Sequence, residues 1–289
     1  MAKGRELKGR IKSVENTRKI TRTMEMVATS KMKRAQDRVT AARPYAAALG
    51  EVMSRLYSPE LAERFPLLRQ PAQLRRAAII LVTSNRGLAG AFNANLLKET
   101  RARLAELEGR GAEVELHVVG RKGIGFFKYL GRTLSMERTD ITDRPSADDA
   151  AGIVDGIMER FASGALDAVY VVYAKFNSAL STPPTTTQIL PVQPPKAGDA
   201  ATQRDYILAP SAEAILTALL PSYVRNSVYR ALAESTAAFY GAQRTAMKSA
   251  TDNAGEMLNV LKRTYNRARQ AQITQEIAEI VGGASALQG

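Results

Sequence analysis

The chain has 289 residues and a formal net charge of +13, and with 45% hydrophobic and 24% charged residues it can bury a core, so wholesale disorder is not expected. It has no cysteine and a single histidine, His117, which excludes disulfides, thiolate metal sites, a cysteine nucleophile and a His–His metal pair. No apolar run reaches the ~18 residues of a membrane span, and no apolar stretch follows the basic start at residues 1–13 as it would in a secretory signal. We expect a soluble, basic intracellular protein with few catalytic groups.

The two ends of the chain predict long helices. Residues 1–43 and 222–281 contain no proline, which breaks helix interiors. Steps of three and four between seam positions are typical of coiled coils. The expected seam positions are Leu7, Ile11, Val14, Ile20, Met24, Val27, Met32, Ala35, Val39 and Ala42 near the start, and Val228, Leu232, Ser235, Phe239, Ala242, Ala246, Ala250, Ala254, Met257 and Leu261 near the end.

Two interpretations of these helices remain. They could be separate amphipathic helices on a globular core, or they could coil around each other in antiparallel fashion. We favour the coiled coil because no other segment offers apolar stripes of matching length, and helices of this length need a partner to cover the stripe.

The middle of the chain predicts an α/β domain. Strands alternate with helices, which indicates a mostly parallel sheet with helices on its faces. Strands are expected at 77–83, 114–119, 133–138 and 168–176, with an edge strand at 185–192, and helices at about 91–107, 121–130 and 147–163. Residues 194–205 are expected to form a loop or linker, and 206–209 a short extended piece.

Two glycine-rich turns occupy places where Rossmann folds bind phosphates. S-N-R-G-L-A-G at 84–90 follows a strand and enters a helix, and G-R-K-G-I-G lies at 120–125. Neither is G-x-G-x-x-G, and no P-loop occurs in the chain. We therefore interpret both as structural turns rather than nucleotide sites.

Candidate catalytic side chains are few. His117 alternates with apolar residues in an expected strand, and Asp148 and Asp149 stand at an expected helix start, where carboxylates suit the helix dipole. All three are interpreted as structural. No nucleophile, base and orienting group come together in the sequence, so neither a catalytic site nor a cofactor or metal site is expected.

The positive charge is concentrated at the start of the chain. Residues 1–43 hold thirteen Lys and Arg against four acidic residues, a net +9. A solvated face, nucleic acid, a membrane surface and an acidic protein are all possible explanations. Nucleic-acid binding lacks interleaved aromatic residues here, and the apolar stripe is thin for a membrane-surface helix. An acidic protein partner fits best.

Four segments resemble one family, the gamma subunit of the F-type ATP synthase. They are N-T-R-K-I-T-R-T-M-E-M-V-A-T-S-K-M-K-R-A at 16–35, S-N-R-G-L-A-G-A-F-N at 84–93, A-M-K-S-A-T-D-N-A at 246–254 and I-T-Q-E-I-A-E-I-V-G-G-A-S-A at 273–286. The family usually has Asp in place of Asn85 and often Cys in place of Ala89. The motifs stand in the family's order and reach from the first helix to the last turns.

The resemblance implies an antiparallel coiled coil of long N- and C-terminal helices, 1–57 and 211–287, with a central Rossmann-like α/β foot domain at 75–195. It implies the central rotor shaft, which couples ion flow through the membrane c-subunit ring to ATP synthesis or hydrolysis and is non-catalytic itself. The implied partners are the alpha and beta subunits of the catalytic hexamer, the epsilon subunit and the c ring, without nucleic acid or direct membrane insertion.

The resemblance also implies contact residues. Those facing the hexamer are Met24, Lys31, Lys33, Arg34, Arg269, Gln270, Thr274 and Glu276, while Asp205 and Tyr206 would contact the ring and epsilon. The small apolar residues from Val281 to Leu287 would turn in the hexamer's upper sleeve. No cysteine-bearing redox insert is present, which excludes thiol regulation. With no transit peptide seen, a bacterial enzyme at the cytoplasmic face of the plasma (inner) membrane is expected. The competing classes are a coiled-coil nucleic-acid binder and a Rossmann-type enzyme with helical arms.

Overall fold

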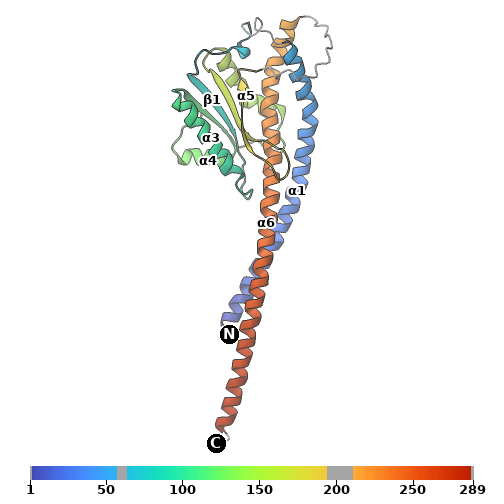
Figure 1. Cartoon of the computed structure of the whole chain (residues 1–289), viewed down its shortest axis with the longest axis vertical. Helices are drawn as coiled ribbons and strands as arrows, with labels where there is room; N and C mark the ends of the chain where they lie inside the picture. The colour runs from blue at the N-terminus through green and yellow to red at the C-terminus, as the bar shows by residue number, and fades with distance from the viewer. Residues whose placement is uncertain (1, 57–63, 194–210, 288–289) are drawn as a thin grey trace. The chain divides into compact units, whose positions relative to one another are not determined.

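Two long helices form the first and last described segments of the chain (Figure 1). The computed structural model describes residues 2–56, 64–193 and 211–287. Helix α1 spans Ala2–Leu56 and helix α6 spans Ala212–Leu287, close to the predicted limits. Both helices continue through a proline, Pro44 in α1 and Pro221 in α6, so they are longer than the proline-free segments alone indicated.

The chain divides into two compact units, and each long helix contributes to both. The arm unit comprises Met1–Ala28 and Arg244–Gly289, and the sheet unit comprises Thr29–Gln243. This division differs from the expected one, which assigned each long helix to a segment of its own and the sheet to residues 75–195.

Within the arm unit, α1 and α6 run antiparallel. The hydroxyl groups of Thr21 and Thr251 are 2.8 Å apart in a hydrogen bond, and Lys262 forms a 3.3 Å ion pair with Glu15. Later residues of α6 thus meet earlier residues of α1. The predicted antiparallel coiled coil is confirmed.

Several predicted seam positions were wrong. Ile20, Val27 and Met257 are 60%, 50% and 55% exposed, whereas Thr21 and Leu258 are buried. Seven residues make about two helical turns and so return to nearly the same face of the helix. Counting in sevens from Val14 leads to Thr21 and then to Ala28, which is also buried. The true seam thus passes through a threonine and an alanine, which a search for large apolar residues passes over.

The sheet unit contains a five-stranded sheet, as far as its described residues show, with the order β3-β2-β1-β4-β5. Its strands are β1 (Arg76–Val82), β2 (Glu113–Val119), β3 (Met136–Arg138), β4 (Ala168–Ala174) and β5 (Pro184–Leu190). Strands β1 to β4 pair in parallel, and β5 pairs antiparallel with β4 at one edge. The predicted mostly parallel sheet with an edge strand near 185–192 is therefore present. That edge strand is antiparallel, and β3 is shorter than expected.

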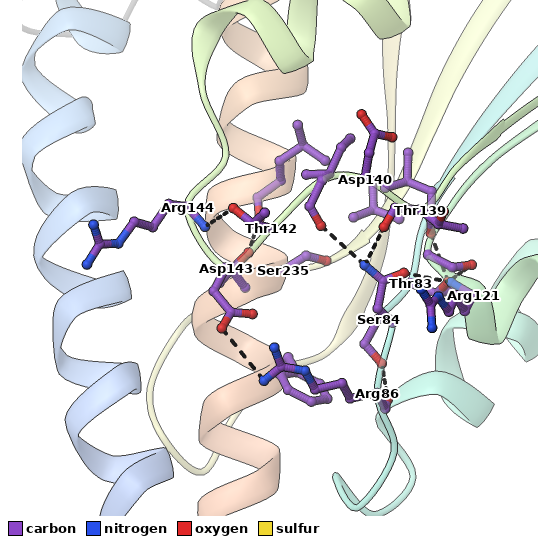
Figure 2. Close-up of a pocket in the computed structure, with 18 of the residues that line it drawn as sticks. Thr83, Ser84, Arg86, Arg121, Thr139, Asp140, Thr142, Asp143, Arg144 and Ser235 are labelled. Carbon is purple, nitrogen blue, oxygen red and sulfur yellow. Dashed lines mark hydrogen bonds and ion pairs between the residues drawn. The ribbon is translucent and has the colours of Figure 1, made fainter.

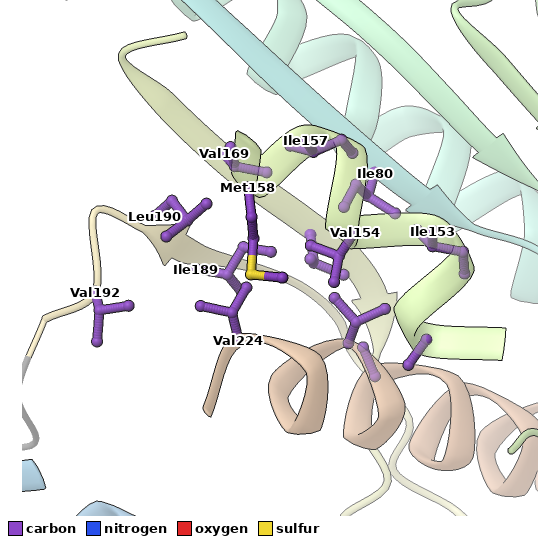
Figure 3. Close-up of a cluster of buried hydrophobic side chains, with 14 of the residues drawn as sticks. Ile80, Ile153, Val154, Ile157, Met158, Val169, Ile189, Leu190, Val192 and Val224 are labelled. Atoms are coloured by element: carbon purple, nitrogen blue, oxygen red, sulfur yellow. The ribbon is translucent and has the colours of Figure 1, made fainter. Parts of the chain in front are cut away.

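Helices cover both faces of the sheet. On one face, α3 (Phe92–Gly109) packs against β1, β2, β4 and β5, and α4 (Arg121–Tyr129) against β2 and α3. On the other face, α5 (Ala147–Ala162) and the first turns of α6 enclose an apolar core, and a 3-10 turn, η1 (Pro66–Leu68), lies against α5. Figure 3 shows this core, in which Val154 of α5, Ile80 of β1 and Val224 of α6 meet.

No helix among the described residues is both long enough and apolar enough to cross a membrane. The expected loop at 194–205 and the extended piece at 206–209 lie outside the described residues.

Candidate functional site

The carboxyl ends of the parallel strands surround a cavity of about 510 Å³ in the sheet unit (Figure 2). In open α/β sheets this edge is where ligands bind. The loop after β1, the start of α4 after β2 and the loop after β3 form its walls, and α6 closes it with Leu232, Ser235, Thr236 and Phe239. Its size suits a small ligand. Whether it can bind a phosphate depends on whether the backbone amides at the start of α4 are free to donate to one.

The position that would hold a phosphate is filled by the chain itself. The first amides of α4 bond to the turn after β1: Arg121 to the side-chain oxygen of Asn85 at 3.0 Å, Lys122 to the carbonyl of Ser84 at 3.1 Å, and Gly123 to the hydroxyl of Thr83 at 3.0 Å. A helix N-terminus attracts anions through such amide groups. Here they already have acceptors, which supports interpreting 84–90 and 120–125 as structural turns.

Gly120 allows this close approach. Its φ of 99° lies in the left-handed region, and a Cβ at this position would overlap the carbonyl group of Thr83. Only glycine tolerates both conditions without strain. The glycine-rich turn therefore serves to pack α4 directly onto the end of β1.

Asn85 ties three loops together. Its amide nitrogen donates to the carbonyls of Thr139 at 3.0 Å and Ile141 at 3.2 Å, and its oxygen accepts from Arg121. The sequence identified this position only as a departure from the family's usual Asp. An amide can donate and accept at once, which is what these three contacts require.

Asp143, in the loop after β3, is the acceptor of a cluster that sequence reasoning missed. Its carboxylate accepts from Lys31 at 2.8 Å, and its carbonyl accepts from Arg38 at 2.8 Å, so two residues of α1 hold one residue of the loop. Lys31 also contacts the Tyr240 hydroxyl of α6 at 3.2 Å, and Arg86 lies 3.8 Å from the carboxylate. The members come from segments far apart in the chain, and no pattern in the sequence marks Asp143.

The electrostatics of this cluster keep it charged. Burial of the Asp143 carboxyl raises its pKa, but hydrogen bonds from Lys31 and Tyr240 and the nearby cations outweigh burial, so the pKa lies below its usual value. The hydrogen bond to Asp143 raises the pKa of Lys31. The pair is therefore ionised at neutral pH.

Helix α6 is bonded to the same edge of the sheet at another loop. The hydroxyl of Ser235 accepts from the backbone amide of Ala174 at 3.1 Å, and the carboxylate of Glu234 accepts from that of Phe176 at 3.4 Å. Both α6 side chains are buried. Thus α1 holds the loop after β3, and α6 holds the end of β4.

The predicted contact residues are distributed over both units. Met24 is half-buried in the arm unit, beside Ile20 and Val27, which steps of four and three place on one side of α1. On α6 of the arm unit, the predicted contact residues are all exposed: Arg269, Gln270, Thr274 and Glu276. The hydroxyl of Thr274 donates to the carbonyl of Gln270, and the carboxylate of Glu276 accepts from the side-chain amide of Gln272. The tip of α6 is apolar and exposed at Ile277, Ile280 and Val281.

The remaining predicted contacts differ in their surroundings. In the sheet unit, Lys33 and Arg34 are exposed, and Lys33 lies 4.0 Å from Asp37 of the same helix. Lys31, predicted to face the hexamer, is half-exposed and donates a hydrogen bond to Asp143. Asp205 and Tyr206 lie outside the described residues.

The candidate catalytic side chains have structural surroundings. Asp149 and Ser146 form a reciprocal capping box at the start of α5. His117 is buried in β2, and neither ring nitrogen has a hydrogen-bond partner; the carboxylate of Glu115 is 3.5 Å away. Burial lowers the pKa of His117, so the ring is neutral at pH 7. The described residues include no cluster of three or more His, Cys, Asp or Glu that could hold a metal.

The fold and site define a two-helix coiled-coil protein that carries a Rossmann-like domain with its phosphate position closed. The ATP synthase family model matches residues 3–287. An ATP synthase gamma chain of Gemmatimonas aurantiaca is 72% identical over 290 residues, covering all of both chains, and one of Leptospira biflexa is 45% identical over 288 residues, covering 99% of this chain and all of the relative. The chain belongs to the ATP synthase gamma chain family.

Solved structures share the fold. The rotor of Euglena gracilis mitochondrial ATP synthase matches with a TM-score of 0.64 at 20% identity, covering 94% of this chain and 99% of that one. A chain of the central stalk and c ring of Tetrahymena thermophila mitochondrial ATP synthase matches with a TM-score of 0.61 at 24% identity, covering 80% and 99%.

Proposed function

We propose that this chain is the central rotor shaft of an F-type ATP synthase, coupling ion flow through the membrane c ring to ATP synthesis or hydrolysis in the catalytic hexamer. The observation that carries the proposal is the full-length 72% identity to an ATP synthase gamma chain. Its partners are the alpha and beta subunits of the hexamer, the epsilon subunit and the c ring.

The arm unit has properties that suit a rotating shaft. It holds fourteen Lys and Arg against seven Asp and Glu, and several of its large apolar side chains are exposed rather than buried. Long-range Coulomb attraction falls gradually with distance, so it can be passed from one acidic partner to the next around a ring. Deep apolar anchors would instead hold one orientation.

The chain itself is non-catalytic in this proposal. The first three backbone amides of α4 bond to Thr83, Ser84 and Asn85, so these amides are not available to bind a phosphate of a nucleotide. Titration calorimetry on the purified chain should detect no micromolar affinity for ATP. Such an affinity would contradict this part of the proposal.

The hexamer contacts are proposed at Met24, Lys33 and Arg34 of α1 and at Arg269, Gln270, Thr274 and Glu276 of α6. The exposure of all of these except half-buried Met24 supports the assignment. Lys31 is proposed to act mainly through Asp143, because its half-exposed side chain is bonded to that carboxylate. Asp205 and Tyr206 are proposed to contact the ring and epsilon on the family resemblance alone.

Arg34 offers a matched test of these contacts. Arg34→Glu should lower ATP-driven proton pumping by the assembled enzyme, because it reverses a charge that faces an acidic partner. Arg43→Glu reverses an equally exposed charge on the same helix, outside the proposed contacts, and serves as the control. Equal effects of the two substitutions would contradict the assignment.

The location proposed is peripheral, at the cytoplasmic face of a bacterial plasma (inner) membrane. The decisive experiment is co-purification of the tagged chain from nuclease-treated membranes. Recovery with alpha and beta subunits and with ATPase activity is the expected result. Nuclease treatment removes any association through nucleic acid, so recovery of the chain alone would refute the proposed function.

A further inference from the structure

Both long helices of the sheet unit bond to loops at the carboxyl edge of the same sheet. Helix α1 reaches the loop after β3 through Lys31 and Arg38, seven residues and so about two turns apart on one face of the helix, and both bond to Asp143. Helix α6 reaches the end of β4 through Ser235 and Glu234. Asp143 and Ser235 both line the cavity drawn in Figure 2.

Lys31 connects these two attachments. Its ammonium group bonds to the Asp143 carboxylate at 2.8 Å and to the Tyr240 hydroxyl of α6 at 3.2 Å. One side chain thus joins α1, α6 and a loop of the sheet. An ion pair with these hydrogen bonds is directional, whereas apolar contacts permit sliding at little cost.

The apolar contacts of α1 in this region are thin. Between Thr29 and Val39, the buried apolar side chains of α1 are Met32, Ala35 and Val39. Alanine buries little apolar area, and the attraction scales with that area. By contrast, α6 contributes Leu216, Leu220, Val224, Val228 and Leu232 to the core beside the sheet. Farther along α1, Met53 and Leu56 belong to this core as well. Between Thr29 and Val39, where α1 buries little apolar area, its bonds to Asp143 carry more of the attachment to the sheet.

We propose that Asp143 is a positioning residue that fixes α1 to the sheet, so that turning of the sheet unit is transmitted to both long helices together. The inference rests on the proposed function, because it assigns a mechanical role to a residue of the shaft. Helix α1 is continuous past Ala28, so the bonds to Asp143 hold a helix that both units share.

The test compares Asp143→Ala with Asp155→Ala in the assembled ATP synthase. Asp155 of α5 is a matched control, since it bonds Arg225 of α6 at 2.7 and 2.8 Å and its side chain is 39% exposed, the same as Asp143. Both substitutions remove a half-exposed ion pair to a long helix, and Asp143→Ala also removes the longer contact with Arg86, but only Asp143 bonds α1.

The readout is the number of protons pumped per ATP hydrolysed. Half-exposed charge pairs change an equilibrium, here that between α1 held to the sheet and α1 released, by up to about fivefold. Asp143→Ala should therefore lower the pumping ratio, by up to about fivefold, while ATP hydrolysis continues. Asp155→Ala should leave the ratio unchanged. The two variants should lose thermal stability to a similar, small extent, because the pairs removed are alike.

A second variant keeps the proposal testable if Asp143→Ala does not assemble. Lys31→Met removes the same pair from α1 and leaves a carboxylate that solvent can reach. It should lower the ratio as Asp143→Ala does, and the double variant should be no worse than either, because both changes remove one interaction.

Two results separate the two claims. Normal ratios for both Asp143→Ala and Lys31→Met, or an equal loss for Asp155→Ala, would overturn the role of Asp143 while leaving the rotor assignment intact. Failure of the wild-type chain to assemble with the other subunits would overturn the rotor assignment itself.

Discussion

The threonine pair in the seam of the arm unit permits a quantitative test of the coiled coil. Thr21 and Thr251 are both buried, and their hydroxyls share a 2.8 Å hydrogen bond. Each hydroxyl also lies within reach of a backbone carbonyl, that of Arg18 at 3.1 Å from Thr21 and that of Met247 at 2.8 Å from Thr251. Each has one proton, so Thr251 donates either to Thr21 or to the carbonyl of Met247. Replacing either threonine by valine preserves the shape but removes one hydroxyl.

Each single substitution should lower the free energy of unfolding by about 0.5–1.5 kcal/mol, the net contribution of one such hydrogen bond. The remaining hydroxyl keeps its backbone acceptor, so the larger penalty of an unsatisfied buried group does not arise. The double variant, Thr21→Val with Thr251→Val, should cost less than the sum of the singles, because both partners are then apolar and of matching shape.

Urea unfolding of the purified chain, followed by circular dichroism at the helix band, measures these differences. The cycle yields a coupling energy between positions 21 and 251, and a favourable coupling of about 0.5 kcal/mol or more is expected for residues in contact. Strictly additive effects would show that the two hydroxyls do not interact in solution.

Three further predictions concern the sheet unit and the arm. Gly120→Ala should lower the free energy of unfolding by at least about 1–3 kcal/mol, because residue 120 has a φ of 99° and a Cβ there would overlap Thr83. Gly125 faces open space within α4, so Gly125→Ala should raise the free energy of unfolding by about 0.5–1 kcal/mol. The urea midpoints of the two variants test this difference. Burial lowers the pKa of His117 in the folded chain, so the unfolded chain binds a proton at this residue more readily than the folded chain does. The free energy of unfolding should therefore fall as the pH drops below about 6.5, by up to about 1.4 kcal/mol per pH unit. In His117→Phe this part of the pH dependence should vanish. Met24→Lys should lower proton pumping per ATP in the assembled enzyme, because a lysine can pair with a partner carboxylate and so stabilise one orientation of the rotor. Normal pumping would contradict this reasoning, and failure to assemble would indicate that Met24 packs in the seam.

The sequence predicted most of the fold because its signals are long and redundant. Continuous apolar runs such as 77–82 and 168–174 indicate strands buried on both faces, and alternation with helices implies their parallel order. The proline-free ends indicated the two long helices. These predictions depend on averages over many residues, so single exceptions such as Pro44 did not disturb them.

The seam and the site depend on single residues, and there sequence reasoning was less accurate. Thr21 and Ala28 occupy seam positions that apolar periodicity alone assigns elsewhere, although Thr21 and Thr251 both lie within family motifs. The Asp143 cluster joins residues 112 and 209 positions apart, and it depends on loop geometry that no local pattern encodes. Lys31 was chosen for its charge, but its contacts in the fold decide its role.

The closed phosphate position has a consequence for how the sheet unit behaves over time. A bound nucleotide occupies its site only in proportion to its concentration, and the site loosens whenever the ligand leaves. The turn formed by Thr83, Ser84 and Asn85 is tethered to α4, so it stays in place at a constant effective concentration. The stiffness of this edge is therefore independent of the cell's supply of ATP, the very compound whose level rises and falls with the work of the assembled enzyme.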